Sequence, residues 1–112
     1  MIKFVWKKNY IINKSRDFIY LKKYGKKYFL PHFLVWFSSV ERDDPPVRLA
    51  VVIRKSVGKA VLRNRIRRII REFFRLNQDK LSRGDYVVIV KKAPQELSLK
   101  GIQKEFVPLL AG

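Results

Sequence analysis

The sequence predicts one mixed α+β domain over residues 1–112, with its elements in the order helix, strand, strand, helix, strand, helix. Three observations carry this prediction. A chain of 112 residues with 47% hydrophobic content suffices for one core. Three short apolar segments, rich in β-branched and aromatic residues, have the composition of strands. Between the second and the third lies a long segment with apolar residues at helical spacing.

The first predicted helix spans Ser15–Tyr24. Ser15 can cap its N-terminus, Asp17 lies in its first turn, and Gly25 is a reasonable stop. Basic side chains crowd the end of this helix: Lys22, Lys23, Lys26 and Lys27. Local interaction with the helix C-terminus explains about half of them, and the others indicate an anionic partner.

The segment His32–Ser38 (HFLVWFS) is apolar at nearly every position and predicts a strand. Its periodicity does not show which face is buried. Either both faces are covered, or one face displays Leu34 and Trp36 to something other than the protein's own core. Glu41–Pro46 follows as an acidic loop, and its two prolines end the strand.

Two further strands enclose the longest helix. Arg48–Arg54 is predicted as a strand, antiparallel to the first if the acidic loop acts as a hairpin. A turn with Gly58 leads into a helix from about Lys59 to Leu76. After another turn, the continuous apolar pattern of Tyr86–Val90 predicts a strand that is buried on both faces.

The C-terminal segment predicts a final amphipathic helix. It covers Pro94–Leu97 and Lys100–Leu110, and Gly101 and Pro108 weaken its ends. Its apolar side consists of Leu97, Ile102, Phe106 and Leu109 or Leu110.

The long helix divides into two sides on a helical wheel. An arc of roughly 120° holds the side expected to pack on the sheet: Leu62, Ile66, Ile69, Ile70, Phe73 and Leu76. An opposite arc of about 100° gathers the polar side: Asn64, Arg67, Arg68, Arg71 and Arg75. A solvated face normally mixes charge signs, whereas this one has only Glu72 at its margin. The polar side is therefore expected to face a bound anion.

The charge of the whole chain points to the same kind of partner. A formal net charge of +17 opposes compaction, so a polyanion is the natural partner, and nucleic acid is favoured over an anionic membrane surface. Apolar runs such as Leu49–Ile53 are too short to span a bilayer, and the N-terminus lacks the apolar core of a signal peptide. We therefore expect a cytoplasmic protein.

Arginine outnumbers lysine on the long helix, which favours folded RNA as the polyanion. The guanidinium group meets phosphate oxygens bidentately and stacks on bases, whereas an ammonium is a point charge. Asn64 is either an exposed or capping amide or a hydrogen-bonding group for RNA. The absence of cysteine and the single histidine exclude a zinc finger and an imidazole metal cluster, so we expect no metal bound by the protein.

The segment from Gly58 to Arg68 (GKAVLRNRIRR), followed by IIREFFR up to Arg75, resembles the signature helix of the bacterial ribonuclease P protein component. The resemblance covers most of the chain. Asp17 and Phe18 with Gly25 resemble the first helix of that family, and the predicted strands resemble its three strands. The N-terminal dozen residues and the C-terminus are poorly covered.

The resemblance implies an α-β-β-α-β-α sandwich of the ribosomal protein S5 domain 2-like type, in which the basic helix lies in a left-handed βαβ crossover, against the general rule. It also implies a function. The catalyst would be an RNA subunit that uses Mg²⁺, and the protein would be its cofactor in removing the 5′ leader from precursor tRNA. The expected partners are this RNA and precursor tRNA, with no membrane and no small-molecule substrate.

The resemblance also implies two sets of contact residues. The RNA subunit would be bound by Lys59, Arg63, Asn64, Arg65, Arg67, Arg68, Arg71 and Arg75. The leader would be bound in a cleft between the first helix and the sheet by Phe18, Lys22, Leu34, Trp36, Val52 and Arg54. The chain departs from the family pattern at Lys22, Ser56 and Lys91, and Trp36 has a core role as its alternative.

Two other classes of function compete with this interpretation. A structural RNA-binding protein would share the basic helix but would have no leader cleft. A nuclease that needs no RNA would require its own nucleophile, base and orienting group within reach of one another, and the sequence provides no such set. The single histidine, His32, is expected to be structural. We therefore expect no catalytic residue in the protein.

Overall fold

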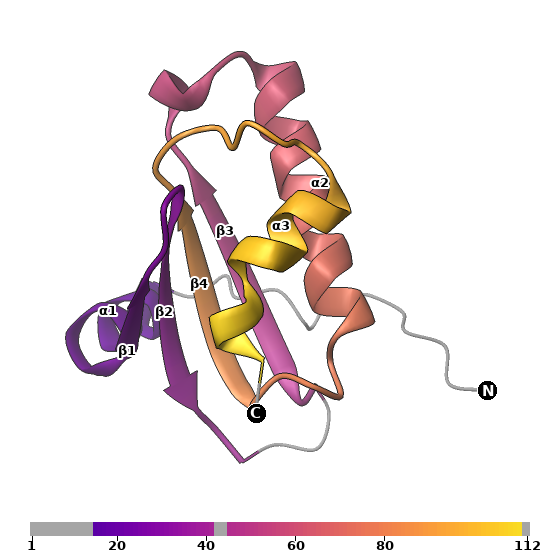
Figure 1. The fold of residues 1–112 in the computed structure, drawn as a ribbon. Coiled ribbons are helices and arrows are strands. Elements are labelled where there is room, and N and C mark those ends of the chain that lie inside the picture. Colours follow the sequence, from indigo (N-terminus) through magenta and orange to yellow (C-terminus); the bar gives the residue numbers. More distant parts are fainter. Residues whose placement is uncertain (1–14, 42–44, 111–112) are drawn as a thin grey trace.

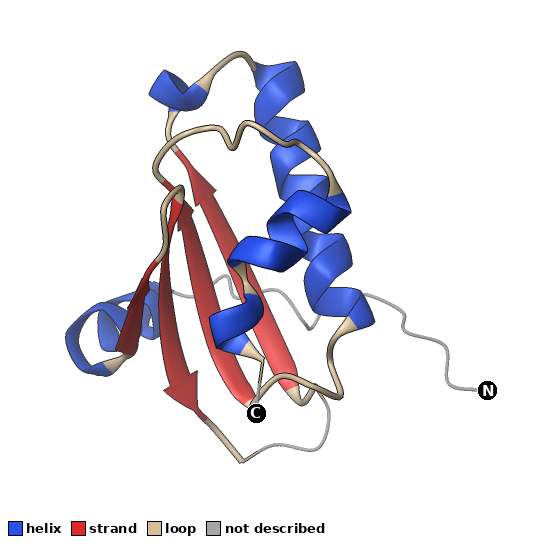
Figure 2. Cartoon of the chain, viewed as in Figure 1, coloured by secondary structure: helices blue, strands red, loops and turns tan. Residues whose placement is uncertain are grey.

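The computed structural model describes residues 15–41 and 45–110, which form a four-stranded sheet with helices on both faces (Figures 1 and 2). Helices α2 and α3 cover one face, and α1 lies on the other. The elements are α1 (Ser15–Tyr24), β1 (Lys26–Phe29), β2 (Phe33–Ser39), β3 (Val47–Ile53), the 3-10 turn η2 (Lys55–Val57), α2 (Ala60–Leu76), β4 (Gly84–Val90), α3 (Leu99–Glu105) and the 3-10 turn η3 (Val107–Leu109).

The strand order is β1-β2-β4-β3. Strand β4 pairs antiparallel with β2 and parallel with β3, and α2 forms the crossover between the parallel strands. The predicted hairpin between His32–Ser38 and Arg48–Arg54, which correspond to β2 and β3, is therefore wrong, because β4 lies between these two strands. The most apolar strand, β4, takes one of the two central positions and contributes to the larger core on one face and to the cluster under α1 on the other. Burial of β4 on both faces was the prediction from its sequence, and all but one of its seven residues are buried.

Strand β1 was not predicted. Its residues Lys26 and Lys27 were interpreted as part of a basic helix end, but Lys26–Phe29 pairs antiparallel with β2 at the edge of the sheet. An edge strand needs only one partner, and exposed lysines on an edge oppose pairing with other chains. These two properties make β1 short and polar, so its sequence lacks the usual signal of a strand.

Gly84 sets the point at which β4 begins, two residues before the predicted start. Its φ is +152°, a conformation that favours glycine. A Cβ atom at this position would lie 2.1 Å from the carbonyl oxygen of Ser38 on β2. Glycine therefore allows the central strand to approach β2 closely from its first residue.

The larger core lies between the sheet and helices α2 and α3. Helix α2 buries Ile66, Ile70, Phe73 and Phe74, and the ring centroid of Phe106 lies 5.2 Å from that of Phe73. The predicted apolar side of α2 omitted Phe74 and included Leu76, which is 38% exposed. Because α3 packs beside α2 as well as over the sheet, the buried stripe is rotated toward Phe74.

Helix α3 is shorter than the predicted final helix. It begins after Ser98, whose hydroxyl accepts a hydrogen bond of 3.1 Å from the backbone N–H of Gly101. The segment Pro94–Leu97 is not helical. After Glu105 the chain continues as η3 rather than as an α-helix. None of the helices in the described part of the chain is long and apolar enough to cross a membrane.

Helix α1 has the predicted bounds and packs on the opposite face of the sheet through a small apolar cluster. Leu21 is buried against Ala50 of β3 and Val87 of β4, and the backbone N–H of Gly25 closes the helix on the carbonyl of Leu21. The predicted cap at Ser15, the N-terminal segment and the middle of the acidic loop lie outside the residues whose side chains are described.

Candidate nucleic-acid interface

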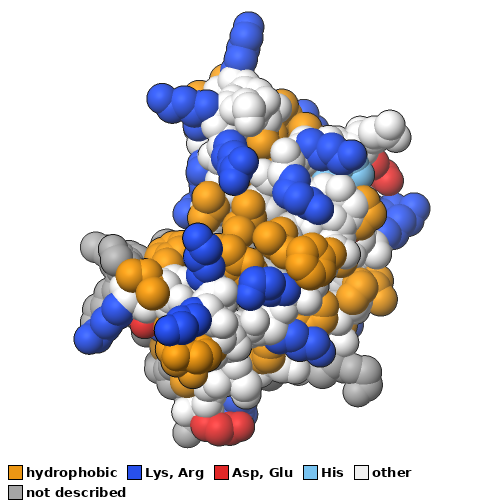
Figure 3. All heavy atoms as spheres, turned by 90° about the vertical axis from the view of Figure 1, so that its left-hand side faces the viewer, with side chains coloured by type: hydrophobic (Ala, Val, Ile, Leu, Met, Phe, Trp, Pro, Cys, Tyr) orange, Lys and Arg blue, Asp and Glu red, His pale blue; other side chains and the backbone are white. Residues whose placement is uncertain are grey.

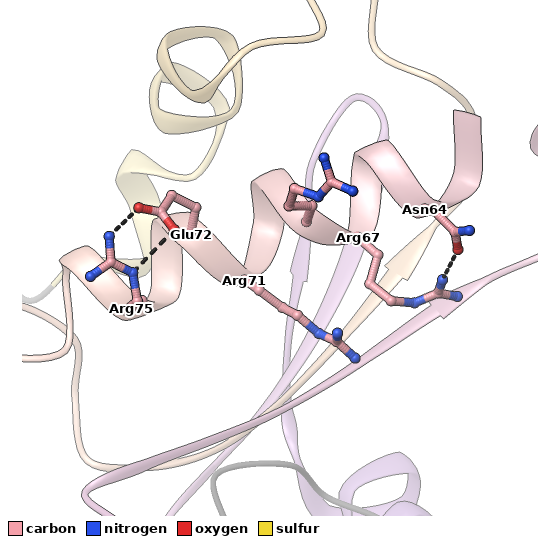
Figure 4. A pocket seen from close by; sticks show the side chains of 6 residues that line it. Asn64, Arg67, Arg71, Glu72 and Arg75 are labelled. Carbon is pink, nitrogen blue, oxygen red and sulfur yellow. Dashed lines mark hydrogen bonds and ion pairs between the residues drawn. The ribbon is translucent and has the colours of Figure 1, made fainter. Parts of the chain in front are cut away.

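The first candidate surface is a groove on the exposed side of α2, with a volume of about 370 Å³. Side chains from successive helical turns line it: Asn64, Arg67, Arg68, Arg71, Glu72 and Arg75. We call this surface the arginine groove (Figure 4). It contains every residue of the predicted polar side, and Glu72 at its margin is its single acid. A concave surface with four guanidinium groups matches a phosphate backbone.

Contacts within the helix hold two of these guanidinium groups in place. Arg67 donates a hydrogen bond of 2.9 Å to the amide oxygen of Asn64, so Asn64 is an acceptor for arginine and not a helix cap. Arg75 pairs with Glu72 through Nε at 3.1 Å and through a second guanidinium nitrogen, and this hydrogen bonding lowers the pKa of the Glu72 carboxyl. Burial and then the charge of Arg67 lower the pKa of Arg71. A bound anion would relieve that repulsion.

The second candidate surface lies on the other face of the sheet, beside α1. It is a cleft of about 820 Å³ that we call the sheet cleft. All six residues predicted to bind the leader line it: Phe18, Lys22, Leu34, Trp36, Val52 and Arg54. Figure 3 shows this side of the molecule, with hydrophobic side chains gathered across the middle and Lys and Arg side chains around them.

The floor of the sheet cleft is built by strand register. Leu34 of β2, Ile89 of β4 and Val52 of β3 are direct cross-strand neighbours, so their side chains share one face of the sheet. On β2, Phe33 and Val35 flank Leu34. Their side chains point into the larger core on the other face of the sheet and are fully buried. This alternation decides between the two interpretations of the apolar strand, because β2 displays Leu34 and Trp36 away from the larger core.

Trp36 lies between a small apolar cluster and the sheet cleft. Its half-buried side chain packs against the cluster around Leu21, and it also lines the sheet cleft. The indole N–H is buried and has no hydrogen-bond partner within the described residues. An unpaired buried donor costs about 1–3 kcal/mol.

The rim of the sheet cleft is basic. Lys22 from α1, Arg54 after β3 and Lys91 after β4 are exposed around the apolar floor. Ser56 also lines the cleft, so all three positions at which the chain departs from the family pattern, Lys22, Ser56 and Lys91, belong to this surface. Three apolar residues that were not predicted also line the cleft, namely Ile19, Ile89 and Val90, and strand alternation from Val87 was the signal for Ile89.

The comparison with known proteins decides the family. A family model described as Ribonuclease P matches residues 6–112. The chain belongs to the ribonuclease P protein family. This membership places it among the protein components of ribonuclease P, a tRNA-processing ribonucleoprotein.

Individual relatives support this assignment. The ribonuclease P protein component of Syntrophus aciditrophicus (strain SB) is 41% identical over 92 residues, which cover 82% of this chain and 76% of that protein. The solved RNase P protein of Thermotoga maritima is 31% identical, with a TM-score of 0.76, covering 88% of this chain and 93% of that chain. The RNase P protein of Staphylococcus aureus is 29% identical, with a TM-score of 0.75 and coverages of 89% and 91%. The mixed α+β fold is the fold of these ribonuclease P proteins.

Only some of the residues that the family resemblance assigned to binding of the RNA subunit line the arginine groove. Lys59, Arg63 and Arg65 do not line the arginine groove. Lys59 is the N-cap residue of α2, and Arg63 is half-buried, with Nε donating to the carbonyl of Gly58 at 3.1 Å. Arg65 points to the far flank of the helix, with one guanidinium nitrogen 3.5 Å from the carbonyl oxygen of Leu97.

A charged cluster holds α1 on the sheet of this ribonuclease P protein. Arg48 of β3 donates to both carboxylate oxygens of Asp85 at 2.9 and 2.7 Å and lies 3.5 Å from the carboxylate of Asp17 on α1. Hydrogen bonding to Asp85 is the largest cause of the raised pKa of Arg48, with the charges of Asp85 and Asp17 adding to it against the effect of burial. Asp17 was interpreted only as a helix-end charge. Its contact fixes the position from which Phe18 and Lys22 reach the cleft.

His32 lies away from both surfaces, in the turn between β1 and β2. Its backbone N–H donates to Glu105 of α3 at 2.7 Å, and its ring Nδ1 lies 3.1 Å from the same carboxylate oxygen. This contact joins α3 to the edge of the sheet and agrees with the structural role that was predicted. Within residues 15–41 and 45–110, no three His, Asp or Glu side chains come together as a metal site.

Proposed function

We propose that this chain is the protein cofactor subunit of ribonuclease P, which binds the catalytic RNA through α2 and the 5′ leader of precursor tRNA in the sheet cleft. The observation that carries the proposal is the separation of two RNA-compatible surfaces on opposite faces of one sheet. One surface is almost purely cationic, and the other has an apolar floor with a basic rim. One molecule can therefore hold two RNA segments at the same time.

The arginine groove is suited to the folded RNA subunit. Bidentate arginine–phosphate contacts supply affinity that does not depend on the base sequence of the RNA. Because the contacts are ionic, this affinity depends on salt concentration. Asn64 and Arg67 are held together by their hydrogen bond, which presents the pair as one unit. Lys59, Arg63 and Arg65 would add contacts around the start of the helix, where the backbone N–H groups of the first turn also attract anions.

The sheet cleft is suited to a single strand. Phe18 and Trp36 offer aromatic surface to unpaired bases, and base–aromatic stacking is worth about 1–3 kcal/mol for each base. Lys22, Arg54 and Lys91 on the rim would neutralise the phosphates of the same strand. Paired bases cannot stack in this way, so the cleft favours the leader over the body of a tRNA.

In this proposal the RNA subunit performs the catalysis and holds the Mg²⁺ that the cleavage uses. The protein contributes binding and orientation of the precursor, and it acts in the cytoplasm. The finer fold assignment, an S5 domain 2-like sandwich with a left-handed crossover, is part of the same proposal. The parallel β3 and β4 strands that α2 connects support the crossover, and its left-handed sense is part of what is proposed.

A reconstitution assay tests the proposal. Precursor tRNA is incubated with a bacterial ribonuclease P RNA alone, with the chain alone, and with both, at low Mg²⁺. Cleavage at the mature 5′ end is expected only when both are present, because the protein screens phosphate repulsion that Mg²⁺ would otherwise have to screen. Cleavage by the chain alone, or no gain from adding the chain to the RNA, would contradict the proposal.

A further inference from the structure

Phe29 of β1 is a large apolar side chain in an unusual position, because 75% of its surface is exposed. Register places it on the cleft side of the sheet. It pairs directly with Leu34 of β2, which lines the sheet cleft. The preceding pair, Tyr28 and Val35, faces the larger core. Cross-strand partners share a face and alternate along a strand, so Phe29 extends the surface on which Leu34 lies.

Phe29 completes an apolar row that crosses all four strands. The row runs through direct cross-strand neighbours: Phe29 on β1, Leu34 on β2, Ile89 on β4 and Val52 on β3. Three interstrand spacings give it a length of about 14 Å. Helix α1 leaves both ends of this row exposed: Leu21 packs on Ala50 and Val87 of the adjacent row, and only Ile89 of this row packs against that cluster. The row is therefore a shelf that continues from the floor of the cleft to the edge of the sheet.

The chemistry around Phe29 favours a nucleic acid over an apolar protein partner. The other β1 residue on this face is Lys27, which is exposed and has its Nζ 3.0 Å from the carbonyl oxygen of Lys22. An ammonium carries three donors, so Lys27 keeps donors for a phosphate. No acid lies on β1. An exposed ring beside an ammonium on an edge strand suits one nucleotide, with its base on the ring and its phosphate on the cation.

We propose that Phe29 is a stacking platform for a further unpaired nucleotide of the leader, which extends the leader site over β1 to the sheet edge. The inference rests on the proposed function of the sheet cleft. Helix α2 packs on β3, the edge strand opposite β1. With the catalytic RNA bound to α2, the leader crosses β3, β4 and β2 before it reaches β1. Phe29 therefore contacts a nucleotide farther from the cleavage site than those in the cleft.

The test uses the full chain assembled with a bacterial ribonuclease P RNA. Equilibrium affinity is measured for mature tRNA and for precursor tRNAs whose leaders lengthen one nucleotide at a time. Phe29→Ala is expected to leave the affinity for mature tRNA and short leaders unchanged. Beyond a threshold leader length, this variant should lower the affinity roughly five- to tenfold. This loss corresponds to the weaker end of the range for base–aromatic stacking, because the Phe29 ring is open to solvent.

Matched variants separate stacking from other effects. Phe29→Tyr keeps the ring and should behave as the natural chain, whereas Phe29→Leu keeps apolar area without a ring and should behave as Phe29→Ala. Tyr24→Ala removes another aromatic residue that is 65% exposed but does not line the cleft, and should show no dependence on leader length. Because Phe29 is exposed, each variant should melt at the temperature of the natural chain.

Two results would overturn the inference. One is an equal loss of affinity for mature tRNA and every precursor, and the other is no loss at any leader length. Phe18→Ala keeps this test distinct from that of the proposed function, because Phe18 lines the cleft itself and should weaken binding from short leaders onward. If Phe18→Ala shows no preference for precursor over mature tRNA, the function of the cleft fails. If Phe18→Ala behaves as expected and Phe29→Ala has no effect, only the extension over β1 fails.

Discussion

Tyr86 of β4 is a side chain whose packing in the core changes its pKa. It is almost completely buried, and its ring contacts Phe37 and Phe74 with centroid separations of 4.7 and 5.2 Å. Its hydroxyl donates a hydrogen bond of 2.8 Å to the carbonyl oxygen of Ser82. Burial raises the pKa of Tyr86 well above its usual value. The native state therefore holds the phenol proton more tightly than the unfolded state does.

The raised pKa of Tyr86 predicts a loss of stability in alkali. Above about pH 10 the phenol ionises in the unfolded chain but stays neutral in the native state, so the free energy of unfolding falls as pH rises. Tyr86→Phe should cost about 1 kcal/mol at neutral pH through the lost hydrogen bond, and should flatten the alkaline decline. Urea titrations at a series of pH values measure both effects. Tyr24→Phe, at an exposed position, is the control, and an equally steep decline in Tyr86→Phe would refute the explanation.

At the scale of elements, α2 combines a core-facing side and an RNA-facing side. Removing Arg68 and Arg71 together should weaken binding of the RNA subunit. Each lost phosphate contact removes roughly 0.7–0.9 from the slope of log affinity against log salt, so the double variant should lose about 1.4–1.8. Filter binding or fluorescence anisotropy across a salt series measures the slope.

The matched control for α2 is the double variant Lys100→Ala and Lys104→Ala. It removes the same charge from exposed positions four residues apart on α3, outside the arginine groove. It should change the salt slope much less than the α2 variant does. Equal slopes for the two double variants would mean that only net charge matters and that the groove is not a specific contact.

Elements with strong local signals were predicted from the sequence with correct bounds or nearly so. Helix α1 ends at Tyr24, before Gly25, as expected, and α2 begins one residue after the predicted start. Strand β1 and the pairing of β4 with β2 were not found, because both depend on contacts distant in the sequence. The pairing partner of an apolar strand cannot be read from its composition, and β1 is a strand only because β2 offers it an edge.

Part of the candidate site could likewise be predicted from the sequence, and part could not. The wheel of α2 correctly grouped the arginine groove, because helical geometry fixes which residues share a side. The six cleft residues came from the family resemblance, and the structure brings all of them together. Phe29 and Asp17 were missed as parts of this region. Their roles follow from sheet register and from a contact with Arg48, which local sequence does not encode.

At the scale of the whole molecule, the net charge of +17 acts across a body with a radius of gyration of only 13.3 Å. The Debye length is about 30 Å at 0.01 M salt and about 10 Å at 0.1 M, so repulsion spans the protein at low salt. We expect the melting temperature to rise with salt over this range. Sulfate should stabilise more than chloride at equal ionic strength, because an anion bound in the native groove favours folding.

The variant that lacks Arg68 and Arg71 separates bound anions from general salt effects. It should lose much of the additional stabilisation by sulfate while keeping the response to chloride. Thermal melts followed by circular dichroism measure both quantities. A melting temperature that falls or stays constant between low and moderate salt would show that self-repulsion does not limit the stability of this fold.

The central position of β4 has a consequence for how the chain is made. During synthesis β2 and β3 emerge first, yet the structure pairs each of them with β4, which is complete only at Val90. Until then the nascent chain has two apolar strands without their central partner, and the core side of α2 lacks part of the sheet that covers it. Such unpaired edges favour wrong association. Completion of the sheet must therefore wait until β4 has emerged from the ribosome, after α2 and its arginines are already exposed.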